Sequence, residues 1–305
     1  MRGDHPNGSL PSFQCAPGFD RRCHTLLFLR SHALHTVYCV VAVVLLASLS
    51  RWLLTHCAPH RTATTTRAAE GNPLKGFAAN PNWSAPPYLQ TVPSSIEFYY
   101  FTLRQIMTGM NDFPGFASVL EPALAASASR NAHACIRFQM DYPTHSTGVP
   151  QFLIDGGLQF NTYTEHGGGE SPNYNDTNLT QALVSFIAAL GQRFDGDRRL
   201  GFIQVGLLGF WGEWHTHPHS SWIPASLKNA VVEAFDNAFN TTLLELRVPW
   251  PSAVSRPSFG FHDDSFAYST LDGTYNGGID VSWFFWPTMV SAGASETWRT
   301  GPLGK

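Results

Sequence analysis

Short apolar runs alternate with helical patterns along the chain from Asn72 onward. A buried strand shows as a short apolar run, whereas an amphipathic helix repeats an apolar position every three or four residues. On this basis the sequence predicts six strands, over residues 72–78, 94–103, 134–142, 201–211, 243–249 and 259–266. Because strands and helices alternate, we expect an α/β fold built on a parallel sheet.

The clearest predicted helix lies between the third and fourth strands. Its apolar stripe consists of Leu179, Leu183, Phe186, Ile187 and Leu190. We expect Thr177 or Asn178 to cap its start and Gly191 to end it. A further helix is marked by Leu227, Val231, Phe235 and Phe239, and another by Phe116, Leu120 and Leu124.

The third predicted strand has one apolar and one polar face. Ile136, Phe138 and Met140 alternate along it with Arg137, Gln139 and Asp141. Such a strand suits a (β/α)8 TIM-type barrel, whose interior becomes a site at the carboxyl ends of its strands. A barrel of this type needs eight strands, and no clear strand follows residue 266. We therefore expect an incomplete barrel that is marginally stable and catalytically silent.

An apolar stretch over residues 36–54 is long enough to span a bilayer. Arginines cluster before it, which by the positive-inside rule favours a cytoplasmic N-terminus. The sequence thus predicts a single-pass membrane protein with a cytoplasmic tail (1–35), a transmembrane signal-anchor (36–54), a stalk (55–71) and a lumenal or extracellular body (72–305). A cleaved signal peptide is the alternative for the apolar stretch.

Composition narrows the choice of partners. Charged residues make up 13% of the chain and the net charge is −3, so a basic face for nucleic acid is not expected. Four of the five cysteines lie in the first 57 residues, which leaves Cys135 alone in the body and argues against a disulfide framework there. N-x-S/T acceptors at Asn82, Asn175, Asn178 and Asn240 agree with a glycoprotein of the secretory route.

The most informative segment is GFWGEWH, residues 209–215, at the predicted end of the fourth strand. It places Glu213 among tryptophans, with Trp211 before it and Trp214 after it. Burial among indole rings raises the pKa of a carboxyl group, which a general acid at neutral pH requires. The alternative role for Glu213 is structural, as a buried carboxylate paired with Arg137 or Arg247.

A glutamate at the end of strand four is where clan-A glycoside hydrolases, which are (β/α)8 barrels, place their acid/base. The order of elements in this chain resembles that clan. Residues 72–305 are also similar to an uncharacterised barrel family, a domain of unknown function. That similarity runs through NPLKGF, YNDTNL…FIAALGQRFDGD, GFIQVGLLGFWGEWH, GFHDDSF and WRTGPLG.

The resemblance implies a glycoside-hydrolase-like barrel that acts on or binds extracellular carbohydrate, with Glu213 as acid/base and no cofactor. Two features depart from the clan pattern. Gly212 stands where the clan usually has asparagine, and the expected carboxylate from strand seven is not found. A non-catalytic carbohydrate-binding barrel and an inactive fragment of a longer enzyme therefore stay open as alternatives.

Other polar and aromatic residues are candidates for the same site. Substrate-binding roles are predicted for Trp211, Trp214, His215, Arg137, Asp141, Arg247, His262 and Asp264. Further candidates to line the same site are Glu97, Tyr99, Gln139, Trp222 and Trp250. At the end of the sixth strand, either Asp263 or Asp264 faces the site or caps a turn. The alternating His215, His217 and His219 favour a solvated loop over a metal site, because Pro218 interrupts them and no carboxylate completes the set.

Overall fold

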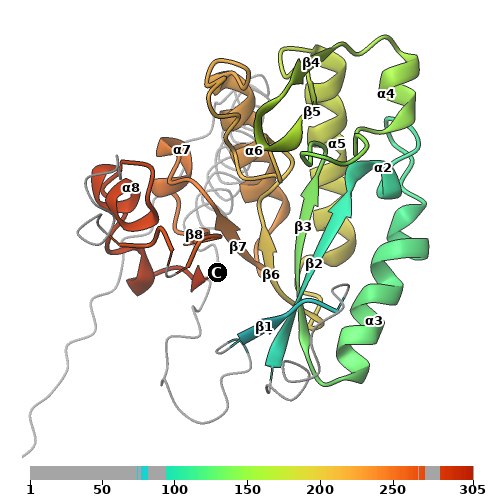
Figure 1. Cartoon of the computed structure of the whole chain (residues 1–305). Helices are drawn as coiled ribbons and strands as arrows, with labels where there is room; N and C mark the ends of the chain where they lie inside the picture. The colour runs from blue at the N-terminus through green and yellow to red at the C-terminus, as the bar shows by residue number, and fades with distance from the viewer. Residues whose placement is uncertain (1–73, 75–76, 82–93, 267, 272–281, 305) are drawn as a thin grey trace, which may run out of the picture. The chain divides into compact units, whose positions relative to one another are not determined.

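The computed structural model describes residues 74, 77–81, 94–266, 268–271 and 282–304 (Figure 1). The predicted tail, signal-anchor and stalk, together with Asn82, lie outside these residues. Within the described ranges, no helix combines the length and hydrophobicity that crossing a bilayer requires.

A parallel sheet of seven strands forms the framework (Figure 1). In space the strands follow their chain order: β1 (Phe77–Ala79), β2 (Ser94–Thr102), β3 (His133–Gln139), β6 (Leu200–Gln204), β7 (Leu243–Leu246), β8 (Phe259–His262) and β9 (Leu303–Gly304). Every pairing between neighbours is parallel. This sequential order is that of a β/α barrel wall, whereas a doubly wound sheet reverses its order at the centre. Among the described residues β1 and β9 do not pair, so the sheet is a curled, open part of a barrel.

Strands occur in the predicted order at the six predicted places, although residues 72–73 and 75–76 of the first lie outside the described residues. The third, fifth and sixth strands end three or four residues earlier than predicted, at Gln139, Leu246 and His262. The fourth was predicted to run to residue 211, and this was wrong, because β6 ends at Gln204. The residues after it include Leu207, Gly209 and Trp211 at positive φ, which a strand cannot contain. β9 was not predicted, since two residues are too few to show a pattern.

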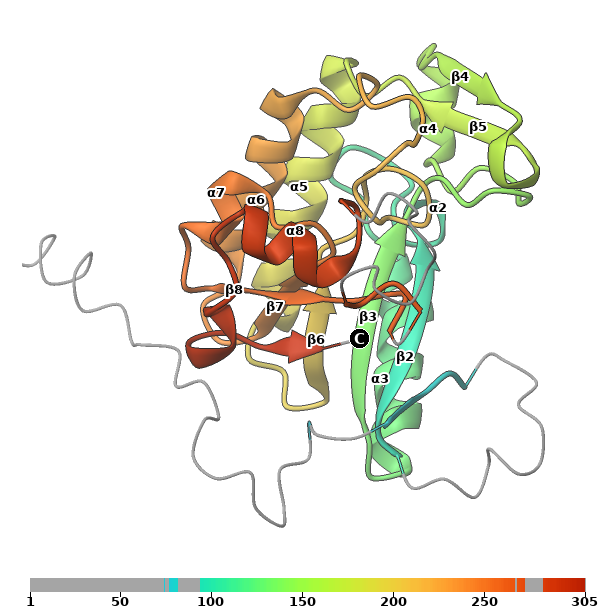
Figure 2. The same cartoon turned by 60° about the vertical axis from the view of Figure 1, so that its left-hand side comes forward.

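The longer helices lie along one face of the sheet, as Figure 2 shows. They are α3 (Glu121–Ser129), α5 (Thr177–Phe194) and α6 (Ala225–Ala238). Shorter helices are α2 (Leu103–Ile106), α4 (Gln151–Asp155), α7 (Pro251–Val254) and α8 (Phe285–Ser291), and single turns are η2 (Phe116–Leu120), η3 (Glu165–Gly167) and η5 (Thr297–Arg299). A hairpin of β4 (Phe160–Tyr163) and β5 (Gly169–Pro172) stands apart from the main sheet.

Helix α5 differs from its prediction at both ends. Its cap is Asp176, whose Oδ1 accepts a hydrogen bond of 2.9 Å from the backbone of Leu179. Gly191 does not end the helix, which continues to Phe194. A Cβ on Gly191 would lie 2.4 Å from the carbonyl oxygen of Ala238, so this glycine serves the close approach of α5 and α6.

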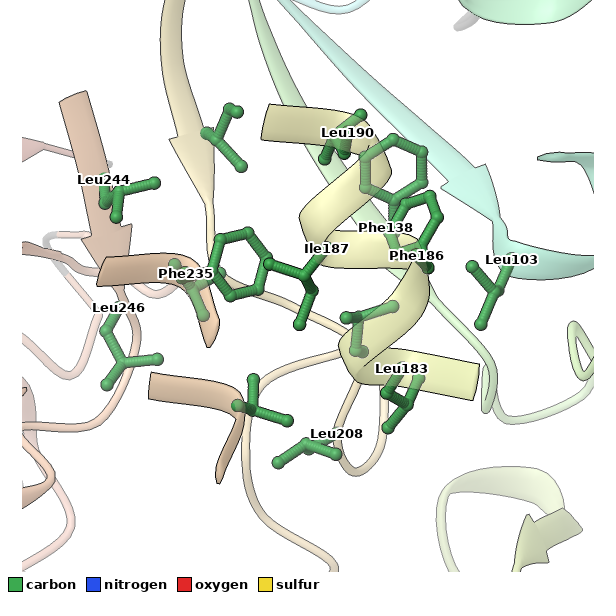
Figure 3. Packing of buried hydrophobic residues seen from close by; sticks show 14 of the residues in the cluster. Leu103, Phe138, Leu183, Phe186, Ile187, Leu190, Leu208, Phe235, Leu244 and Leu246 are labelled. Carbon is green, nitrogen blue, oxygen red and sulfur yellow. The ribbon is translucent and has the colours of Figure 1, made fainter. Parts of the chain in front are cut away.

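The predicted stripe of α5 is the centre of the core. Figure 3 shows Leu183, Phe186, Ile187 and Leu190 among side chains from the sheet and α6, namely Phe138, Leu244, Leu246 and Phe235. All of these side chains are at most 1% exposed. The apolar face of β3 therefore points toward α5, and its polar face points to the opposite side of the sheet, which we call the inner face.

Candidate functional site

A row of polar side chains crosses the inner face from strand to strand. Tyr100 of β2 is in register with Arg137 of β3, Arg137 with Gln204 of β6, and Gln204 with Glu245 of β7. Successive residues of a strand point to opposite faces, so four paired positions in register place four polar groups side by side. We call the carboxyl edge of the sheet above this row, with Arg137, Glu213, Arg247 and Asp264, the mouth.

Arg137 is the centre of the mouth and is fully buried. Its Nε donates to Gln204 Oε1 at 2.9 Å, and its Nη1 donates to the Tyr100 hydroxyl at 2.9 Å. Nη2 donates to Asp264 Oδ1 at 2.5 Å. The guanidinium also lies over the rings of Phe98 and Tyr100, with 5.5 and 5.3 Å to the centroids. A buried guanidinium satisfied on this many sides fixes the position of the groups around it.

The loop that follows β6 has an unusual backbone. Positive φ angles occur at Leu207, Gly209, Trp211, Gly212 and Trp214. For the residues other than glycine, this conformation costs on the order of 1 kcal/mol or more each. Hydrogen bonds hold the loop: Leu207 N to Phe138 O at 2.7 Å, Trp211 N to Asp141 O at 2.8 Å, and Trp214 Nε1 to Val205 O at 2.7 Å. Strain that the surroundings enforce in this way is typical of functional sites.

This loop brings Glu213 back to the mouth. Its Oε1 lies 3.8 Å from Arg137 Nη1, and its Oε2 lies 3.3 Å from His215 Nε2. The Glu213 side chain is 19% exposed, so it contacts both solvent and the buried row. A side chain on Gly212 would need φ of +71° and would place its Cβ 3.0 Å from Phe138 O. The backbone at this position therefore favours glycine.

The four tryptophans that were candidates for stacking on a sugar have different roles. Trp214 is 1% exposed, and its indole nitrogen donates to main-chain oxygens of the loop, so it is part of the core. Trp222 stacks on His219 with 4.1 Å between ring centroids, and Trp250 donates to Asn229 of α6. Only Trp211 lies beside the mouth, partly exposed and 6.0 Å from the ring of His215.

Asp263 and Asp264 follow β8, and the sequence left open which of them faces the site and which one caps a turn. Asp263 organises the turn, since its oxygens accept from Ser265 N at 2.9 Å and from Thr270 Oγ1 at 2.6 Å. Asp264 faces the mouth and binds Arg137. Burial raises the pKa of Asp264, but Arg137 and His262 outweigh burial and hold it well below its usual range. Burial lowers the pKa of His262, which is therefore neutral at pH 7.

Some predicted site residues lie elsewhere. The oxygens of Asp141 accept from the hydroxyls of Tyr163 and Ser171, so Asp141 anchors the β4–β5 hairpin. Burial raises the pKa of Asp141. Glu97 was a candidate for the mouth, but it lies on the opposite face of β2, where Arg130 of the α3 end binds it at 2.6 Å. That bond to Arg130 lowers the pKa of Glu97 to about 2.

Tyr99 shares the face of Glu97 and not of the mouth, because its hydroxyl donates to Glu97 Oε2 at 2.9 Å. The three alternating histidines also separate: His215 approaches Glu213, His219 lies 3.2 Å from Glu165, and His217 is exposed. In the part of the chain that the structure describes, no group of three or more His, Cys, Asp or Glu side chains is arranged to hold a metal ion. Cys135 is buried and free, and burial raises the pKa of its thiol.

Sequence reasoning did not assign Tyr100, Gln204 or Glu245 to the site. Gln204 and Glu245 are single polar residues inside apolar runs, which is the signal that could have found them. Glu245 is 2% exposed, and burial raises its pKa to about 8 against the opposing effects of Gln204 and Arg137. A neutral carboxyl group therefore lies in the buried row at pH 7.

A surface groove of about 670 Å³ lies away from the mouth, between α5 and α6. Its lining includes Val184, Ala188, Gln192 and Asn237. The carboxylate lining it, Asp195, already accepts bonds from the backbone of residues 240–242. The groove therefore offers no free catalytic group, and the chemistry of the described residues is concentrated at the mouth.

Comparisons with known proteins give no family for this chain. No family model and no curated protein sequence matches it. Similar solved structures include endo-glycoceramidase II from Rhodococcus sp. as a lactosyl-enzyme intermediate, with 10% identity, a TM-score of 0.45, and coverage of 69% of this chain and 56% of that one. The cellobiose-like imidazole complex of the same enzyme has 11% identity, a TM-score of 0.43 and coverage of 69% and 57%.

An endoglucanase from Pseudomonas stutzeri, Cel5A, is similar at 12% identity with a TM-score of 0.36 and coverage of 60% of this chain and 54% of that one. The chain thus spans little more than half the length of the structures it matches. Similarity at these identities and TM-scores defines neither a family nor an activity for this chain.

Proposed function

We propose that the mouth binds carbohydrate and that Glu213 is its general acid/base. The observation that carries this proposal is that Glu213 and Asp264 approach the same guanidinium, that of Arg137, from different elements. Two carboxyl groups with different environments are what hydrolysis of a glycosidic bond uses, one to protonate the leaving oxygen and one to supply negative charge. Partly exposed Trp211 offers an aromatic ring for a sugar face.

Within this proposal each carboxyl group has a separate role. Asp264 stays ionised because Arg137 and His262 keep its pKa low, so it supplies the negative charge. Glu213 is partly exposed and lies 3.3 Å from His215, a position from which it could exchange a proton with a bound sugar. Tyr100 and Gln204 orient Arg137 between the two.

The second candidate is carbohydrate binding without hydrolysis. It is favoured by the short ion pair of Asp264 Oδ1 with Arg137, 2.5 Å, which uses one oxygen of Asp264 as a structural counter-ion. A carboxylate held in this way is a poorer nucleophile or base than a free one.

A glycan array followed by an assay for newly formed reducing ends separates the two candidates. If the chain hydrolyses a bound glycan, Glu213→Gln should lower the rate by about 100-fold or more while binding persists. Exposed Glu233 on α6 provides the matched control, because Glu233→Gln changes the same group far from the mouth. Binding without release supports the second candidate, and absence of glycan binding contradicts the proposal as a whole.

We further propose that residues 36–54 anchor the chain and that the body lies in the lumen or outside the cell. This proposal is supported by the arginines before the apolar stretch and by acceptor sequences after it. Asn175, Asn178 and Asn240 are exposed on the surface of the folded body, where there is room for an attached glycan.

Treatment of the expressed full-length protein with an N-glycosidase should increase its gel mobility. The physical reason is that each attached glycan adds mass on the lumenal side only. A variant with Asn82, Asn175, Asn178 and Asn240 all changed to Gln is the control and should show no shift. An unchanged mobility of the wild type, with protease access from the cytoplasmic side of microsomes, would refute the proposed topology.

A further inference from the structure

Arg247, just after β7, is a buried guanidinium that lacks hydrogen bonds to the other described residues. Its side chain is 9% exposed, and its Nε is buried without a partner. The nearest carboxylates are within ion-pair distance but too far away for a hydrogen bond. Asp264 Oδ2 lies 3.8 Å from Nε, and Asp263 Oδ1 lies 3.9 Å from Nη2. Asp264 Oδ2 is itself buried and has no hydrogen-bond partner among the described residues.

Buried polar atoms without hydrogen-bond partners are unusual in the interior of a folded protein. Leaving a buried charged donor without its hydrogen bonds costs more than leaving a neutral one unpaired. Arg137, which is also buried and lies in the same mouth, has hydrogen-bond partners for all three of its nitrogens. The contrast indicates that Arg247 Nε, although paired in charge with Asp264, has a hydrogen-bonding capacity that the described residues do not use.

The distance between Arg247 Nε and Asp264 Oδ2, the two atoms without hydrogen-bond partners, indicates which chemical group could bind between them. An oxygen atom at ordinary hydrogen-bond distance from both Nε and Oδ2 bridges a gap of 3.8 Å. To do so it must accept from the guanidinium and donate to the carboxylate. A hydroxyl group does both, whereas an ionised carboxylate or sulfate only accepts.

The charge of the mouth favours a neutral ligand over an acidic one. Two guanidinium groups, Arg137 and Arg247, face three carboxylates, Glu213, Asp263 and Asp264, so their net formal charge is −1. The other buried titratable groups at the mouth, on β7 and β8, are neutral at pH 7. An acidic sugar would add a negative charge to a cluster whose formal charge is already −1, and its ionised oxygens could not donate to Asp264 Oδ2.

We propose that Arg247 and Asp264 form a hydroxyl-binding subsite, in which one hydroxyl of a neutral sugar bridges Arg247 Nε and Asp264 Oδ2. The proposal deepens the carbohydrate-binding function proposed above and rests on it. It names the ligand class as neutral glycans, in preference to glycans of uronic acids or sulfated sugars.

The test compares binding of three oligosaccharides of equal length by titration calorimetry: a neutral one, its uronic acid counterpart and its amino-sugar counterpart. The neutral oligosaccharide should bind most tightly to the wild-type chain, because an ammonium group in place of the bridging hydroxyl cannot accept from Arg247 Nε, and a carboxylate cannot donate to Asp264 Oδ2. Arg247→Gln and Arg247→Lys should each weaken its binding by about 10- to 100-fold, since neither side chain reproduces the charged fork of arginine. Arg193→Gln, at an exposed position on α5, is the matched control and should leave binding unchanged.

Each outcome decides the proposal. Tighter binding of the uronic acid or amino-sugar oligomer, or unchanged affinity in both folded Arg247 variants, overturns the subsite while leaving carbohydrate binding intact. A crystal structure of the complex with a water, and no sugar hydroxyl, between Nε and Oδ2 overturns it as well. If no oligosaccharide binds the wild type, the proposed function itself fails, and thermal melting curves establish that each variant is folded.

Discussion

Replacing Arg137 with methionine is expected to lower the free energy of unfolding by about 3–5 kcal/mol. Methionine fills a similar volume but leaves Asp264 as a buried carboxylate without its main counter-ion. It also removes the hydrogen bonds to Tyr100 and Gln204, two further members of the buried row. The pKa of Asp264 should rise in the variant, because burial, which raises it, is then opposed mainly by His262.

Urea unfolding curves measured for the wild type and the variant check this expectation. The difference should shrink as the pH falls and Asp264 takes up a proton, since the protonated group no longer needs a counter-ion. Adding Asp264→Asn to Arg137→Met should recover part of the lost stability. A loss below 1 kcal/mol, or strictly additive effects in the double variant, would contradict the central role of Arg137. If Arg137→Met does not fold, Arg137→Lys, which keeps the charge, should fold and show a smaller loss.

Replacing Glu245 with glutamine is expected to stabilise the protein at neutral pH, by about 3 kcal/mol at most. In the folded state burial raises the pKa of Glu245 to about 8, against an ordinary value of 4.5. As the pH rises from 4.5 to about 8, the unfolded chain loses this proton and the folded chain keeps it. The free energy of unfolding therefore falls with rising pH over this window, by up to about 1.4 kcal/mol per pH unit.

Glutamine has no proton to lose, so the Glu245→Gln variant should lack this part of the pH dependence. Unfolding curves at pH 5 and pH 8 should show a small difference between wild type and variant at pH 5 and a large one at pH 8. Glu233→Gln, at an exposed position of α6, is the control and should behave as the wild type at both values. An equal difference at pH 5 and pH 8 would show that Glu245 is ionised in the folded protein.

The order and type of the main elements followed from the sequence alone. Six strands and the stripe of α5 were predicted, because apolar periodicity is a local property that records which face of each element is buried. The polar face of β3 was read in the same way, and it placed Arg137 on the side of the sheet that carries the mouth. The similarity in pattern to barrel enzymes also pointed to the carboxyl edge of the sheet as the place to search.

Local sequence patterns did not predict the ends of elements or the roles of side chains where these depend on close packing or on backbone conformation. Gly191 has the appearance of a helix stop, but its role depends on Ala238, which lies 47 residues further along the chain. The strand after residue 200 looked long because its apolar run continues, and only the positive φ angles from Leu207 onward end it. Trp214 looked like a ring for stacking on sugar, yet its indole nitrogen is used inside the loop.

The composition of the mouth was decided by the tertiary structure. The sequence supplied Glu213, Arg137, Arg247 and Asp264 as candidates, but it gave no means of separating Asp264 from Asp263 or of excluding Asp141. That separation depends on which side chains from distant strands lie within hydrogen-bond distance, and register across a parallel sheet sets those distances. The row from Tyr100 to Glu245, and the unfilled donors of Arg247, exist only because β2, β3, β6 and β7 pair in that register.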